Sequence, residues 1–216
     1  MPSAYSLLDL DTWSRREHFH FFRGYDNPFF NLCADVDVSR VAEACRAAGG
    51  PSFFAASLYL SLRAANDVEP FRYRIHGDDV VVYDVIHAGS TILRDDGTFG
   101  FGYFAFSSGF GAFRAQVEEV VEAARKGSGA LEDRTDRDDM IHYSVIPWIA
   151  FTSFSHARRW GTEESVPKIV FGRRNGNPGA ERMPLSVEVH HALVDGLHVG
   201  EFFRRFQDYL DEPPLD

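Results

Sequence analysis

The segment from residue 182 to residue 210 constrains the fold most, because its hydrophobic period changes within a short stretch. Three aliphatic residues first alternate with three polar ones, as in a strand whose two faces differ: Leu185, Val187, Val189, Ser186, Glu188 and His190. After Gly196 the apolar residues recur at helical spacing up to Leu210. A strand followed directly by an amphipathic helix must bury both apolar faces together, which favours an α/β architecture.

The rest of the chain also alternates between helical and strand-like patterns. Ser14 and Glu17 have the spacing of a capping box, which predicts a helix from Trp13. The expected helices are 13–22, 38–48, 52–66, 111–125 and 196–210. The expected strands are 28–37, 70–75, 79–84, 142–146, 149–154, 167–173 and 182–190, with a hairpin of 86–93 and 98–106. We expect residues 127–139 to form a polar surface loop, and residues 1–216 to form one α/β domain (α+β, two layers) with a mixed sheet packed by helices.

Composition excludes several classes of function. The chain has 216 residues and a net charge of −10, which opposes binding to nucleic acids or to anionic membranes. No stretch approaches the roughly 18 apolar residues that a membrane span needs. Residues 1–10 have no basic region and no apolar core, so we expect no secretory signal and a cytoplasmic protein. Cys33 and Cys45 form no metal pattern, and we expect reduced thiols and no metal.

Phenylalanine is the unusual component, with 20 residues in the chain. Clusters at 20–22, 101–106 and 110–113 exceed what one small core needs. Part of this apolar surface is therefore expected to line a ligand pocket or a subunit interface. A core rich in phenylalanine is an alternative of equal weight.

The densest polar signal in an apolar context is 183–200. By strand alternation His191 continues the apolar face and His190 the polar face. An imidazole at the end of a strand, on its buried face, is a good general base. Asp195 lies four residues later, at the start of the expected helix, where an anion is favoured. The alternative is a hydrogen-bonded core histidine, and these residues alone give the two readings equal weight.

Four segments together resemble the chloramphenicol acetyltransferase family. They are HHALVDGLHVGEFF (190–203), LDLDTWSRREHFHFF (8–22), SVIPWIAFTSF (144–154) and MPLSVEVHH (183–191). Their order and spacing match the family from about residue 5 to residue 210. The His-x-x-x-Asp-Gly core alone is shared more widely among CoA-dependent acyltransferases.

The resemblance implies a reaction and residues that carry it. Acetyl-CoA, a co-substrate, would donate an acetyl group to a hydroxyl of chloramphenicol or another small molecule. His191 would act as the base and Ser144 would hydrogen-bond the oxyanion. Asp195 and Arg15 would form a buried ion pair that keeps the segment in shape. Two further residues are implied near CoA: Trp148, which would pack beneath the site, and Arg173.

The acceptor positions depart from the family pattern. Phe22 replaces a tyrosine, His142 an asparagine and Val170 a threonine, while Phe101 replaces a small residue and Phe99 is retained. These changes remove polar groups and add bulk, so acetyl transfer is expected more firmly than chloramphenicol as its acceptor. The alternatives are an acyltransferase with another donor or acceptor, and a non-catalytic binding protein on the same fold.

The resemblance also implies assembly. The family forms homotrimers with active sites at subunit interfaces. We therefore expect His191 of one chain to face Ser144, Phe22 and Phe99 of the next. A monomer with an internal cleft is the alternative.

Overall fold

The computed structural model describes residues 3–127, 137–158 and 164–215. Helices and strands alternate along these segments, as the hydrophobic periods predict. Their bounds are β1 Tyr5–Leu7, α1 Arg16–Phe22, β2 Phe29–Asp37, α2 Ser39–Arg46, α3 Phe53–Asp67, a 3₁₀ helix Glu69–Arg72, β3 Tyr73–His76, β4 Asp79–Tyr83, β5 His87–Leu93, β6 Phe99–Phe104, α4 Phe110–Lys126, β7 Met140–Val145, β8 Lys168–Phe171, β9 Arg182–His190 and α5 Gly196–Asp211.

The described strands form a six-stranded mixed sheet in the order β2-β9-β8-β7-β5-β6. The pairs β5–β7 and β7–β8 are parallel, and the other pairs are antiparallel. Strands β1, β4 and β3 form a second, smaller sheet that the sequence analysis does not separate from the first. The α/β fold class with a mixed sheet packed by helices is confirmed.

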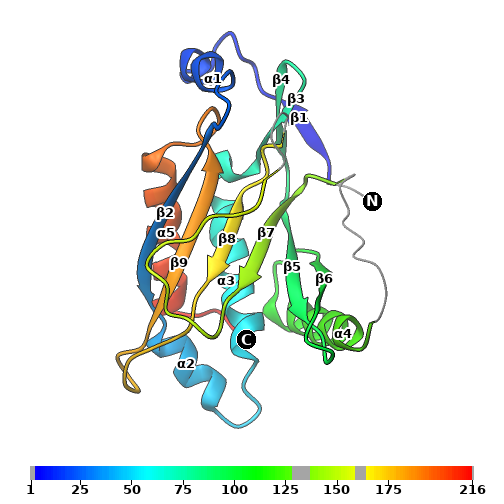
Figure 1. The fold of residues 1–216 in the computed structure, drawn as a ribbon, viewed down its shortest axis with the longest axis vertical. Coiled ribbons are helices and arrows are strands. Elements are labelled where there is room, and N and C mark those ends of the chain that lie inside the picture. Colours follow the sequence, from blue (N-terminus) through cyan, green and yellow to red (C-terminus); the bar gives the residue numbers. More distant parts are fainter. Residues whose placement is uncertain (1–2, 128–136, 159–163, 216) are drawn as a thin grey trace.

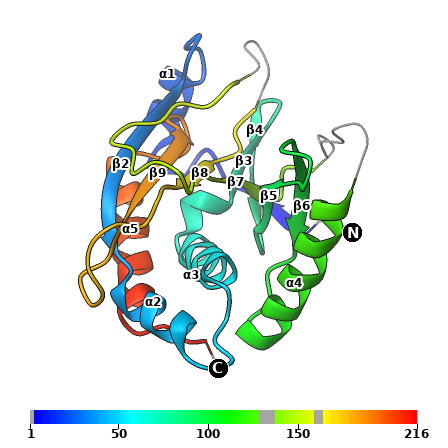
Figure 2. The same ribbon diagram turned by 60° about the horizontal axis from the view of Figure 1, so that its bottom comes forward.

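Helices α2, α3, α4 and α5 lie on one side of the large sheet (Figures 1 and 2). Helix α3 is buried on nearly all sides, because small and apolar residues occupy most of its circumference. It begins at Ser52, whose side chain accepts a hydrogen bond from the backbone N–H of Ala55 at 3.1 Å. The core lies between these helices and the sheet, and the apolar face of β9 is completely buried in it.

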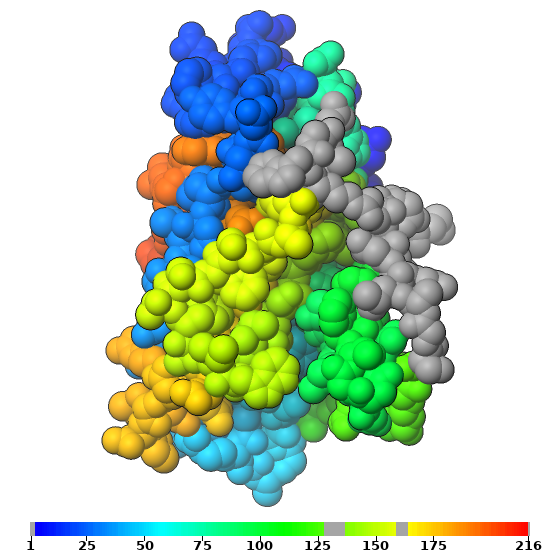
Figure 3. Space-filling model, viewed as in Figure 1, coloured from blue at the N-terminus to red at the C-terminus, as the bar shows by residue number. Residues whose placement is uncertain are grey.

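The opposite face of the large sheet is covered by residues 146–158, which lie over it as an extended segment (Figures 1 and 3). The backbone N–H of Arg173 donates to the carbonyl of Ile149 at 2.9 Å, which ties this segment to the end of β8. The pattern of residues 149–154 predicts a strand, and this prediction is wrong, because the segment crosses the face of the sheet instead of joining its ladder.

Two further expectations need correction, and a third falls mostly outside the described residues. Helix α1 begins at Arg16, and no side chain caps it, so Ser14 and Glu17 do not form a capping box. A 3₁₀ helix around Pro70 replaces the start of the strand expected at 70–75. Most of the polar loop expected at 127–139 lies outside the described residues.

Other features agree with expectation. Residues 87–104 form an antiparallel hairpin that reverses at Arg94–Thr98. Cys33 and Cys45 are both free thiols. No helix in the described part of the chain is long and apolar enough to cross a membrane.

Candidate active site

His191 follows the last residue of β9, at the turn into α5. Its backbone N–H donates to the carbonyl of Pro28 at 2.7 Å, which fixes the turn against the start of β2. Its imidazole stacks face to face on Phe22, with ring centroids 3.9 Å apart and planes inclined by 12°. Phe30 contacts the ring at 4.7 Å. Two phenyl rings therefore fix the imidazole of His191 in position.

The Nδ1 atom of His191 is buried and has no hydrogen-bond partner among the described residues. Because the phenyl rings of Phe22 and Phe30 offer no hydrogen bond, the ring is held by packing and by its backbone. The sequence analysis assigns the Phe22 contact to a neighbouring chain, whereas the structure forms it within one chain.

His190 has the more buried side chain of the two, with 6% exposure. Its ring meets Phe29 edge to face at 4.9 Å. Burial, together with the charge of Arg158, lowers the pKa of His190 to about 4. His191 packs on Phe22 and Phe30 on the apolar side, as alternation predicts, while His190 lies on the polar face, which is also buried because residues 146–158 cover it.

Asp195 joins the His191 turn to α5 and to the segment before α1. It is the N-cap of α5, where its Oδ1 accepts from Leu197 N–H at 3.1 Å and its own N–H donates to His198 Nδ1. Its Oδ2 accepts from Arg15 Nη1, and the side chain of Arg15 is 12% exposed. Nη2 of Arg15 donates to the carbonyl of His191 at 3.2 Å. The pair thus contacts the backbone of His191 directly.

These contacts stabilise the charged form of the Asp195 carboxylate. Burial acts to raise its pKa, but His198, Arg15 and two backbone N–H groups outweigh burial, so the pKa lies below its usual value. Burial lowers the pKa of His198.

Ser144 and His142 lie on β7, on the face that residues 146–158 cover. The intervening Tyr143 points into the core, where its hydroxyl meets Ser61 at 3.1 Å. In register, Ser144 pairs with Val170 on β8, which is completely buried and in turn pairs with Ser186 on β9. Ser144 therefore lies in a row across three strands.

Within one chain Ser144 and His191 are far apart. Ser186 lies in the row of Ser144, and His190 lies four residues farther along β9, a rise of about 13 Å. Two strand spacings of about 5 Å each add to this distance. One chain therefore does not bring its own Ser144 and His191 together.

The remaining predicted positions lie at edges of the sheet. Phe99 and Phe101 are on β6, with ring centroids 5.8 Å apart. Trp148 and Arg173 lie on two loops joined by the hydrogen bond from Arg173 to Ile149. Trp148 is 60% exposed, so the expectation that it packs beneath a site is not met within one chain.

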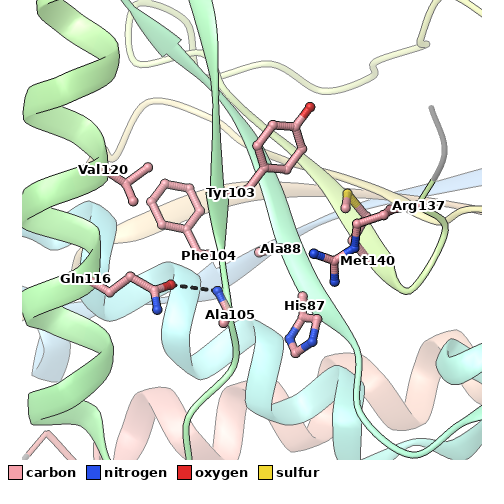
Figure 4. A pocket seen from close by; sticks show the side chains of 9 residues that line it. All are labelled: His87, Ala88, Tyr103, Phe104, Ala105, Gln116, Val120, Arg137 and Met140. Carbon is pink, nitrogen blue, oxygen red and sulfur yellow. Dashed lines mark hydrogen bonds between the residues drawn. The ribbon is translucent and has the colours of Figure 1, made fainter. Parts of the chain in front are cut away.

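A separate cavity of about 320 Å³ lies between α4 and the β5–β6 hairpin (Figure 4). Its lining includes His87 and Gln116 but none of the predicted site residues. Both nitrogens of His87 have structural partners, Phe106 N–H and Ser3 Oγ, each at 3.0 Å. Gln116 accepts from Ala105 N–H at 2.6 Å. The hydrogen bonds of His87 and Gln116 in this cavity therefore stabilise the fold.

Sequence reasoning missed the charged residues on the covered face of the sheet. Arg158 donates to Glu188 at 2.6 Å, and Lys168 contacts Glu164 at 2.9 Å. Alternation identifies Glu188 only as a polar residue of a strand. The partner that buries it, Arg158, comes from a segment with no regular period, so no pattern signalled the pair.

Comparisons with known proteins point to one family. A family model described as chloramphenicol acetyltransferase matches residues 3–207. Chloramphenicol acetyltransferase 3 of Escherichia coli is 27% identical over 205 residues, which cover 94% of this chain and 96% of that protein. The chloramphenicol acetyltransferase of Streptomyces acrimycini is 27% identical over 208 residues, covering 95% and 94%.

Solved structures give the same result. A chloramphenicol acetyltransferase that is 31% identical superposes with a TM-score of 0.88, covering 96% of this chain and all of that chain. A dihydrolipoamide acetyltransferase from Azotobacter vinelandii, 17% identical, superposes with a TM-score of 0.62 over 90% of this chain and 85% of that chain. The second likeness concerns the fold alone.

Proposed function

The chain belongs to the chloramphenicol acetyltransferase family, and from that premise we propose that it transfers the acetyl group of acetyl-CoA to the hydroxyl of a small molecule. It is an acetyltransferase of this family. The observation that carries the finer proposal is the packing of His191, which two phenyl rings and the Arg15–Asp195 pair hold in one orientation.

In the proposed reaction His191 is the general base. Nδ1 is buried between apolar groups, so Nε2 is the nitrogen that takes the proton from the acceptor hydroxyl. As that proton leaves, the hydroxyl oxygen forms a bond to the thioester carbonyl carbon. The tetrahedral intermediate then breaks its carbon–sulfur bond, and the departing thiolate takes the proton back from His191. The products are CoA and an O-acetyl ester.

Ser144 supplies a hydrogen bond to the oxyanion of that intermediate in this proposal. Arg15 and Asp195 are positioning residues, because they reach His191 only through its backbone carbonyl. Trp148 and Arg173, on their joined loops, contact CoA. The acceptor is contacted by Phe22, Phe99, Phe101 and His142, and Val170, which is completely buried beside Ser144, supports the site from below.

The distance between Ser144 and His191 in one chain supports a site shared between two chains. We propose a homotrimer in which His191 of one chain faces Ser144 and Phe99 of the next. Exposed apolar side chains support a large interface, since Trp148 is 60%, Ile149 58% and Phe99 43% exposed in the isolated chain.

The test is release of free CoA, measured with a thiol reagent. Purified protein is given acetyl-CoA with chloramphenicol or with other small alcohols. Release that requires an acceptor, and that falls to background in the His191→Ala variant, supports the proposal. Absence of acceptor-dependent release with every alcohol contradicts it.

A further inference from the structure

A second hydroxyl lies beside Ser144, on the neighbouring strand of the large sheet. Strands β5 and β7 are parallel and adjacent (Figure 1), and the last pair in their ladder is Ser90 with Tyr143. Thr91 and Ser144 are the next residue on each strand, so they lie side by side just beyond that pair. Neighbouring strands are about 5 Å apart, and the backbones of Thr91 and Ser144 are separated by about this distance.

The two hydroxyl side chains lie on the same face of the sheet. Ser90 and Tyr143 are each 1% exposed and belong to the face that meets the core. Since successive side chains of a strand alternate between its two faces, Thr91 and Ser144 both point to the opposite face. Both residues are partly exposed in the isolated chain, so a bound molecule can reach them.

These two hydroxyls differ from others nearby in having no structural partner. Ser186, in the row of Ser144, accepts a hydrogen bond from the side chain of Asn31 at 2.7 Å. Ser90 donates to the carbonyl of Thr91 at 3.3 Å. Within the described part of the chain, neither the hydroxyl of Thr91 nor that of Ser144 makes a hydrogen bond. Both hydroxyls can therefore donate to a bound molecule.

The neighbours of this hydroxyl pair across the sheet are apolar. Val170, which pairs with Ser144 on β8, is completely buried. Phe101 pairs with Thr91 on β6, so Thr91 lies between two residues of the proposed site. An oxyanion held by Ser144 alone would receive one hydrogen bond from this part of the sheet. A charge removed from water is costly without further donors.

The spacing of the pair suits one oxygen bound by both hydroxyls. A hydroxyl donor lies about 2.7 Å from its acceptor, so two donors to the same oxygen are at most about 5.4 Å apart. That limit matches the separation of neighbouring strands, which is about 5 Å. Side chains that stand in parallel on one face can therefore meet a common oxygen between them.

We propose that Thr91 donates a second hydrogen bond to the oxyanion, beside that of Ser144. This inference rests on the proposed acetyl transfer, and it adds a catalytic residue to that reaction. The carbonyl oxygen of the thioester becomes the oxyanion when the acceptor hydroxyl, deprotonated by His191, bonds to the carbonyl carbon. Thr91 and Ser144 hold that oxygen until the carbon–sulfur bond breaks and the carbonyl forms again.

Thr91→Val tests this inference, because valine keeps the shape of the side chain and removes its hydroxyl. CoA release is measured with the best acceptor found among chloramphenicol and other small alcohols. We expect kcat to fall at least about tenfold, since the loss of one oxyanion donor costs about 100- to 1000-fold in a well-studied case. The KM values for acetyl-CoA and for the acceptor should change little, because the hydrogen bond strengthens only in the transition state.

Two further variants separate a catalytic role from a structural one. Thr91→Ser keeps the hydroxyl and should retain most of the turnover. Ser90→Ala is the matched control, because it removes a hydroxyl from the adjacent residue of β5, on the core face. Its turnover per folded molecule should equal that of the wild type. The melting temperature of Thr91→Val should stay close to that of the wild type.

The outcomes distinguish this inference from the proposed reaction. Acceptor-dependent release that is unchanged in Thr91→Val would overturn the role of Thr91 and leave the acetyl transfer intact. A higher KM for the acceptor at unchanged kcat would do the same, since Thr91 would then bind the acceptor and not the oxyanion. A lower kcat in Thr91→Ser as well, with lower melting temperatures in both variants, would make the residue structural. A lack of acceptor-dependent release by the wild type would overturn both.

Discussion

The adjacent histidines His190 and His191, at the end of β9, pack on different faces of the sheet. Single substitutions should therefore distinguish their roles. We predict that His191→Ala lowers kcat at least about 100-fold, the lower range for loss of a general base. Its ring packs on Phe22 and Phe30 at the surface of the core, so the fold should persist. Steady-state kinetics and a circular dichroism melt check both statements, and near-normal turnover would refute the assignment.

His190→Ala is the matched control. Its side chain is 6% exposed and packs on Phe29, so its loss should leave a cavity and lower the melting temperature. Turnover per folded molecule should fall far less than in His191→Ala. A larger loss of turnover at His190 would reverse the two roles.

The difference between these histidines marks a limit of sequence reasoning. Alternation correctly places Leu185, Val187 and Val189 in the core, because one face of β9 meets the helices. It marks the opposite face as polar, and residues 146–158 cover that face and bury Glu188 and His190 as well. Cover by an irregular segment leaves no periodic signal, so the buried pair of Arg158 and Glu188 could not be predicted.

Two buried histidines should make stability depend on pH. Burial lowers the pKa of His156 and of His190 to about 4, whereas an unfolded histidine titrates near 6.5. Above pH 6.5 both histidines are neutral in the folded and in the unfolded state, so they do not reduce the free energy of unfolding. As pH falls toward 4 the unfolded state takes up protons first, so stability is lost, by up to about 2 kcal/mol for each histidine at pH 5.

Urea unfolding at pH 7 and pH 5 measures this loss. We predict that the free energy of unfolding falls between these values and that His156→Phe reduces the fall. Asp195 does not contribute to the difference between the two pH values. Its pKa is lowered, so its carboxylate changes charge only in more acidic solution. A wild type equally stable at both values would contradict the prediction.

At the scale of elements, Asp195 links the start of α5 to the segment before α1. Asp195→Ala removes the helix cap, worth about 1 kcal/mol, and leaves the largely buried Arg15 without its carboxylate. We predict that this variant loses both thermal stability and turnover.

Asp195→Asn distinguishes the two effects. Asparagine caps a helix as well as aspartate but carries no charge for Arg15. Its melting temperature should lie between those of the wild type and Asp195→Ala, with turnover still reduced. Identical melting temperatures for the two variants would mean that the cap contributes nothing.

The elements themselves were largely predictable where the chain keeps one period. Helix α3, the hairpin of β5 and β6, and helix α5 all follow from periodicity and turn residues. The start of α1 was not, because the capping-box spacing of Ser14 and Glu17 competes with the pairing of Arg15 to Asp195, 180 residues away. Local spacing carries no information about so distant a contact.

At the scale of the whole molecule, the separation of Ser144 from His191 in one chain predicts assembly. The chain has a mass of 24.4 kDa, and we expect a solution mass about three times larger. Light scattering coupled to size-exclusion chromatography measures it. Full activity in a species near 24.4 kDa would reject a shared site.

Mixing two inactive variants tests directly whether the site is shared. His191→Ala retains Ser144, and Ser144→Ala retains His191, so each variant alone should be nearly inactive. If each site combines His191 of one chain with Ser144 of the next, random reassembly of an equal mixture makes about a quarter of the sites complete. Activity should therefore rise to about a quarter of the wild-type value after the mixture is unfolded and refolded together. Mixing the same variants without unfolding should give less, because assembled chains exchange slowly, and refolding each variant alone should give none. If the site were built within one chain, the mixture could not recover activity, because no single chain in it carries both side chains. A refolded mixture as inactive as its components would therefore show that Ser144 and His191 act within the same chain or not together at all.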